Sequence, residues 1–128
     1  MILDPIRKYQ IKPANAASGQ VCTLLSKPFG LGVGIDQQVI AAITGKRIRI
    51  MGLMVQADGA GNPYIGFQTG AAGARILGAF YPSIVTLPPF LLPITDSGYA
   101  ETIAGDGLYA DVGVAAVTGS VFYVAYVP

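Results

Sequence analysis

The sequence predicts an all-β fold, on three observations. Short apolar segments rich in valine and isoleucine recur with turn signals roughly every 8–12 residues, as in β-sandwiches. The 17 glycines and 9 prolines separate these segments and disfavour helix interiors. No stretch carries a convincing helical period of apolar residues. About eight strands result, which indicates a jelly-roll-like antiparallel β-sandwich with an extended N-terminal arm.

The expected strands follow from alternation and from the turns between them. Asp58 to Pro63 and Ala104 to Gly107 are loop and turn signals, and Pro88-Pro89 confines its segment to an edge or a bend. A short strand at residues 21–25 belongs to the arm. The other expected strands or extended segments occupy residues 38–43, 47–57, 64–69, 75–81, 83–92, 98–102, 108–116 and 120–127.

Two of these strands are apolar on both faces. Residues 47–57 begin as strict alternation, with Ile48 and Ile50 opposite Arg47 and Arg49, and then lose it. Residues 120–127 are apolar on both faces after Ser120. One face of such a strand fills the sandwich, and the other must be covered by something else. We expect a partner copy to supply that cover, at a subunit interface that contains Met51, Leu53, Val55, Phe122, Val124 and Tyr126.

Residues 1–34 differ from the sandwich domain expected at 35–128. They combine apolar anchors with cations, and Pro5 and Pro13 prevent a regular amphipathic helix. Such an arm cannot bury its anchors against itself. We expect it to dock on a neighbouring copy or another protein. Its apolar residues would supply the affinity, and its cations would guide the approach by electrostatic attraction. The candidate contacts are Ile2, Leu3, Ile6, Arg7, Lys8, Tyr9, Ile11 and Lys12.

Charge is scarce and unevenly distributed. Charged residues make up 12% of the chain and apolar residues 52%, so some apolar surface is expected to meet other protein. Residues 1–49 hold seven cations and two carboxylates, a net charge of +5, and residues 50–128 hold one cation and five carboxylates, a net charge of −4. This asymmetry is either an ordinary solvated surface or electrostatic complementarity between partners.

Few residues suit catalysis or cofactor binding. The chain has no histidine, and its single cysteine, Cys22, is expected to be a small buried residue in a protein made in a reducing cytoplasm. A carboxylate pair or a calcium site among Asp96, Glu101, Asp106 and Asp111 stays open as an alternative, although turns explain these residues better. We therefore expect no enzymatic activity, no catalytic residue, no cofactor and no metal.

Nucleic acid and membranes are not expected partners. The cations are few and no aromatic ladder is interleaved with them. The longest uncharged stretch, residues 76–95, contains four prolines that would break a spanning helix.

From residue 43 onward, the order of short motifs resembles a known family. The motifs are Thr44-Gly-Lys-Arg-Ile-Arg49, Phe67-Gln-Thr-Gly70, Gly78-Ala79, Leu91-Leu-Pro93, Gly98-Tyr-Ala-Glu-Thr102, Ala104-Gly-Asp-Gly-Leu108 and Val117-Thr-Gly119. In this order they resemble small tailed-phage and prophage structural proteins of the head decoration, or cement, type. The resemblance covers about two-thirds of the chain and leaves out the arm.

The resemblance implies a non-enzymatic virion protein of jelly-roll type, often trimeric. Its partners would be the major capsid protein and other copies of itself, and it would be made in the bacterial host cytoplasm and sit on the outer capsid surface. The alternative is another small virion component, such as a tail, fibre or head-spike subunit. An enzyme or a carbohydrate-binding module is a further alternative. The absence of tryptophan weakens the case for carbohydrate binding.

Overall fold

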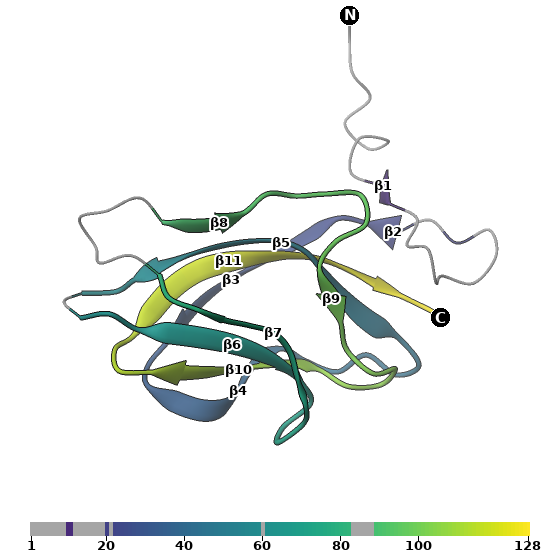
Figure 1. Cartoon of the computed structure of the whole chain (residues 1–128). Helices are drawn as coiled ribbons and strands as arrows, with labels where there is room; N and C mark the ends of the chain where they lie inside the picture. Colours follow the sequence, from purple (N-terminus) through teal and green to yellow (C-terminus); the bar gives the residue numbers. More distant parts are fainter. Residues whose placement is uncertain (1–9, 12–19, 21, 60, 83–88) are drawn as a thin grey trace, which may run out of the picture.

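Two antiparallel sheets face each other across one core (Figure 1). The computed structural model describes residues 10–11, 20, 22–59, 61–82 and 89–128, and within them there are strands and turns but no helix. Sheet I contains, in spatial order, β4 (Gly34–Ile40), β10 (Leu108–Gly113), β6 (Tyr64–Thr69) and β7 (Arg75–Phe80). Sheet II contains β3 (Leu25–Leu31), β11 (Val117–Tyr126), β5 (Arg47–Ala57) and β8 (Phe90–Leu92), and the short β9 (Ala100–Glu101) also pairs with β5.

The order of the strands confirms the expected jelly-roll topology. Among these eight main strands, only β6 and β7 are consecutive in the chain and paired in one sheet. The other connections carry the chain between sheets, and the first and last main strands, β3 and β11, lie side by side in sheet II. This arrangement is the double Greek key of a jelly roll.

The core lies between the two sheets and is built from the inward residues of each strand. Phe67 on β6 is fully buried and meets Phe29 edge-on at a centroid distance of 6.3 Å. Burying each large apolar side chain contributes about 1.5–3 kcal/mol. The fully buried members of this core include Ile48, Ile50, Leu53, Val55, Ile65, Phe67, Leu108, Val117 and Val121.

A β-bulge explains why β5 has apolar residues at both odd-numbered and even-numbered positions. In the pairing of β11 with β5, Phe122 is opposite Gly52 and Tyr123 is opposite Ile50, so Met51 is an extra residue. The bulge shifts the alternation by one, and Ile48, Ile50, Leu53 and Val55 all enter the same core. Met51 itself turns to the outer side of sheet II.

The boundary expected between arm and sandwich is wrong. The sandwich does not begin at residue 35, because residues 25–31 form β3 and pair along their whole length with β11. Pro28 lies in this strand, which an edge position allows since one side of an edge strand needs no backbone donors. Upstream, β1 (Gln10–Ile11) pairs antiparallel with β2 (Cys22–Thr23).

Candidate interaction surface

The outer face of sheet II carries an open group of apolar side chains. The register places Met54 of β5 opposite Leu91 of β8, so both side chains point away from the core. Met54 is 40% exposed, Leu91 59% and Ile94 47%. Phe122 of β11 is half-buried beside them. We call these four residues, Met54, Leu91, Ile94 and Phe122, the outer patch.

Two shallow grooves mark the same face of sheet II. The larger, of about 370 Å³, is lined by Leu24, Leu25, Ser26, Ile94 and Phe122. The smaller, of about 280 Å³, is lined by Phe29, Met54, Val55, Gln56, Pro89, Thr118, Gly119 and Ser120. Gly52 lies beneath Ile94, because a Cβ at Gly52 would come within 2.8 Å of the Ile94 Cγ1 atom. The glycine lets the segment after β8 lie directly on the sheet.

Five of the six residues expected at a subunit interface are buried within the single chain. Met51, Leu53, Val55, Val124 and Tyr126 each have 0% exposure, so they cannot contact a partner copy. Leu53 and Val55 belong to the main core because of the bulge. Met51, Val124 and Tyr126 do lie on the outer side of sheet II, but Cys22 and Leu24 of the same chain pack against them. Only Phe122 keeps an accessible surface.

Most of the candidate contacts in the arm lie outside the described residues: Ile2, Leu3, Ile6, Arg7, Lys8, Tyr9 and Lys12. Ile11 lies in β1, paired with Cys22 of β2. The docking of the arm therefore stays a prediction. Gln20, the next described residue, is fixed on the body of the protein, since its side-chain amide donates to the carbonyl of Val127 at 2.7 Å and accepts from the amide of Val127 at 2.8 Å.

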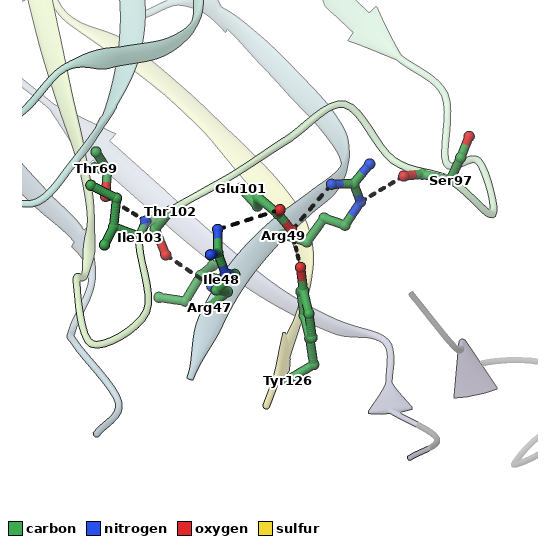
Figure 2. Close-up of polar contacts among 9 residues, drawn as sticks. All are labelled: Arg47, Ile48, Arg49, Thr69, Ser97, Glu101, Thr102, Ile103 and Tyr126. Atoms are coloured by element: carbon green, nitrogen blue, oxygen red, sulfur yellow. Dashed lines mark hydrogen bonds and ion pairs between the residues drawn. The ribbon is translucent and has the colours of Figure 1, made fainter. Parts of the chain in front are cut away.

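A polar network joins three strands at one end of sheet II (Figure 2). The carboxylate of Glu101 in β9 forms ion pairs with Arg47 Nη1 at 3.5 Å and with Arg49 Nη1 at 3.3 Å. The hydroxyl of Tyr126 donates to the same carboxylate, and Arg49 Nε donates to the carbonyl of Ser97 at 2.6 Å. The side chain of Glu101 is 18% exposed, so these interactions are only partly screened by water. The network ties β9 to both β5 and β11.

Burial controls the two pKa shifts on this side of the molecule. It raises the pKa of Tyr126 to about 12, helped by the hydrogen bond to Glu101 and by its negative charge, while Arg47 and Arg49 act in the opposite direction. Burial also raises the pKa of the Cys22 thiol. Cys22 is 7% exposed and packs with Met51 and Tyr126, as the sequence predicts for a small buried residue. A thiol with a raised pKa is a weak nucleophile at neutral pH.

Two other carboxylates of the acidic half, those of Asp106 and Asp111, make structural contacts. Asp106 accepts a hydrogen bond from the Thr69 hydroxyl at 2.9 Å, and Thr69 in turn accepts from the amide of Ile103 at 2.8 Å. Asp111 accepts from the amide of Asp36 at 2.9 Å and pairs with Arg75 at 3.4 Å. The contacts of Asp106 and Thr69 link the turn after β9 to sheet I.

The exposed members of the outer patch were not expected from the sequence. The sequence predicts Met54 within the strand at residues 47–57 but not on a contact surface, because strict alternation without a bulge does not single it out. A glycine inside a strand pattern is a known sign of a bulge, and Gly52 offers that sign. Leu91 and Ile94 lie on either side of Leu92-Pro93, in a segment with weak strand character, and no periodic pattern assigns their side chains to a face.

No family model matches the sequence. No curated protein matches it either. Among the described residues, no group of three or more His, Cys, Asp or Glu side chains is placed to hold a metal ion. In the same part of the chain, no helix has the length and apolar character needed to cross a membrane.

Proposed function

We propose that the chain is a non-enzymatic decoration, or cement, protein of a tailed-phage head. It would be made in the cytoplasm of the bacterial host and bind the major capsid protein on the outer surface of the virion. The order of the motifs from residue 43 onward supports this proposal, and so does the jelly-roll sandwich. The observation that carries it is the outer patch on sheet II, where Met54, Leu91 and Ile94 are exposed together.

The outer patch fits a protein partner better than it fits a small molecule. Small-molecule sites enclose their ligand and combine an apolar lining with a few convergent polar groups. The outer patch instead lies on the face of a sheet and consists of apolar side chains beside the shallow grooves. Contiguous exposed apolar surface of this kind marks protein interfaces. The tail, fibre or head-spike alternative would use the same surface.

A charge placed in the outer patch should weaken binding to the capsid. We expect Leu91→Lys to reduce binding to heads assembled without this chain by about tenfold or more, because a lysine ammonium would be desolvated at the interface. Ile103→Lys is the matched control. Ile103 is also 59% exposed, but it lies in the turn after β9. Co-sedimentation of each variant with the heads measures the effect. Equal binding by both variants would remove the outer patch from the contact.

Self-association into a trimer also stays a prediction. The buried positions of Met51, Leu53, Val55, Val124 and Tyr126 leave Phe122 as the only accessible member of the expected interface. Sedimentation velocity at micromolar concentration checks the stoichiometry. A monodisperse monomer would show that the chain assembles only on its target or not at all.

A further inference from the structure

The outer face of sheet I, which points away from sheet II, differs in chemistry from the outer patch (Figure 1). Ile65, Phe67 and Ala110 belong to the core, so the alternate residues of β6 and β10 point outward. The outward pairs in the register are Tyr64 opposite Gly113, Gly66 opposite Asp111 and Gln68 opposite Tyr109. Aromatic and polar side chains therefore share this face with two glycines.

The two glycines let large planar side chains lie close to the backbone of the sheet. A Cβ at Gly113 would overlap the ring of Tyr64, the residue directly opposite, so this ring lies across the glycine. A Cβ at Gly66 would come within 2.7 Å of the guanidinium group of Arg75. Both groups need the space that a side chain on the facing strand would otherwise fill.

These planar side chains are accessible to a ligand. Tyr64 is half-buried, and its ring centroid lies 6.4 Å from that of Tyr81, which is 73% exposed. The side chain of Arg75 is 42% exposed and pairs with Asp111 at 3.4 Å. Two aromatic rings thus lie beside a guanidinium group and a carboxylate that are already held in place by each other.

The charges on sheet I restrict the class of ligand. Its four strands hold one cation, Arg75, and two carboxylates, Asp36 and Asp111, a net charge of −1. Asp111 pairs with Arg75, and Asp36 accepts from the Gln68 side chain at 2.6 Å and from the amide of Ala72 at 2.9 Å. Nucleic-acid binding needs cations along the backbone, and an acidic ligand would be repelled. The face suits an uncharged ligand that combines apolar surface with hydroxyl groups.

We propose that the outer face of sheet I binds a neutral oligosaccharide. The rings of Tyr64 and Tyr81 would stack on the apolar C–H faces of sugar units, because an aromatic side chain offers a large rigid apolar surface. The ion pair of Arg75 and Asp111 would bond the sugar hydroxyls. Its guanidinium donates and its carboxylate accepts, and each hydroxyl can do both.

The length of the face favours several sugar units over one. Residues two positions apart in a strand are separated by about 7 Å, so roughly 14 Å separates the row of Tyr64 from the row of Tyr109. The hydroxyl of Tyr109 donates to the exposed side chain of Gln38 at 3.1 Å, which gives this end polar groups of its own. An oligosaccharide can contact both ends at once, so we expect the affinity to rise with the length of the sugar chain.

Titration of the free protein with sugars tests the proposal. The probes are neutral tetrasaccharides of glucose, mannose, galactose and N-acetylglucosamine, with their monosaccharides as length controls and tetragalacturonate as the acidic control. At least one neutral tetrasaccharide should shift the backbone amide resonances of β6, β7 and β10 in NMR spectra at about 10 mM or less, as a millimolar dissociation constant requires. Tyr81→Ala should weaken this binding by about tenfold or more, because it removes the most exposed ring. Leu91→Lys, on the outer face of sheet II, is the control and should leave it unchanged.

Three outcomes of this titration would overturn the proposal. They are the absence of shifts with all four neutral tetrasaccharides, binding of tetragalacturonate as tight as that of the neutral sugars, and equal affinities of Tyr81→Ala and the unmodified protein. Tighter binding of single-stranded oligothymidylate than of any sugar would also overturn it, because the rings would then stack on bases. The titration uses no phage heads, so its result is independent of whether the chain binds a capsid.

Discussion

A chain that lacks Met51 should still fold into the same sandwich. Removing this residue joins Ile50 directly to Gly52, and these two residues already pair with the consecutive residues Tyr123 and Phe122 of β11. The deletion therefore removes the bulge and leaves a regular ladder. Its cost should match that of Met51→Ala, about 2–4 kcal/mol, because both lose the same buried side chain. Chemical denaturation followed by circular dichroism measures both variants.

Deleting Met54 from the same strand should be far more damaging than substituting it. Met54 is 40% exposed, so Met54→Ala should cost less than about 1 kcal/mol. Deleting Met54 shifts the alternation of one half of β5 by one position. Either Leu53 then leaves the core or Gln56 enters it. Either choice costs about 4 kcal/mol or more. If the two deletions were equally harmful, or if deleting Met51 unfolded the chain, the bulge would not explain the pattern of β5.

Glu101→Gln should destabilise the sandwich by about 2 kcal/mol. The substitution keeps the shape of the side chain but removes the charge that holds Arg47 and Arg49 on one face of β5. Without it the two guanidinium groups repel each other, and β9 loses its ion pairs to β5. Asp96→Asn is the control, because Asp96 is exposed in the loop before β9 and its change should stay within about 0.5 kcal/mol. Equal effects of the two substitutions would mean that the network contributes no stability.

The same network predicts a loss of stability at high pH. The pKa of Tyr126 rises from 10.0 to about 12 on folding, so the folded protein keeps the phenol neutral where the unfolded chain ionises it. The stabilisation is complete below pH 10.0 and decreases as the pH rises towards 12. The difference in unfolding free energy between the unmodified protein and Tyr126→Phe should therefore shrink over this range. A constant difference would contradict the raised pKa.

The sequence carries enough information for the fold class and for most strand positions. The expected strands at residues 47–57 and 64–69 have the bounds of β5 and β6. Apolar and β-branched residues bounded by turn signals identify both strands, although the bulge at Met51 interrupts the alternation of β5. The strand expected at 108–116 ends at Gly113, because Val114 adopts a positive φ of 74° and starts the turn into β11. β11 then begins at Val117 and not at residue 120.

The features that the sequence pattern missed depend on tertiary context. β3 contains Lys27, Pro28 and Gly30, and it is a strand because β11 pairs with it along its whole length, not because of its own alternation. The subunit interface was misplaced because a single extra residue, Met51, exchanges the faces of β5, and because the covering group for β11 is the distant residue Leu24. Counting apolar residues shows that a face is covered. It cannot show whether the cover is the same chain or another.

The most direct measurement for the proposed function is the position of the protein in intact virions that encode it. A labelled chain, imaged on purified particles, should appear as a regular lattice over the outer surface of the head. The Leu91→Lys variant should be depleted from that lattice, while the Ile103→Lys variant should occupy it normally. Label confined to the tail or its fibres would favour the other class of virion component. Absence of label from the particle would contradict a structural role in the virion altogether.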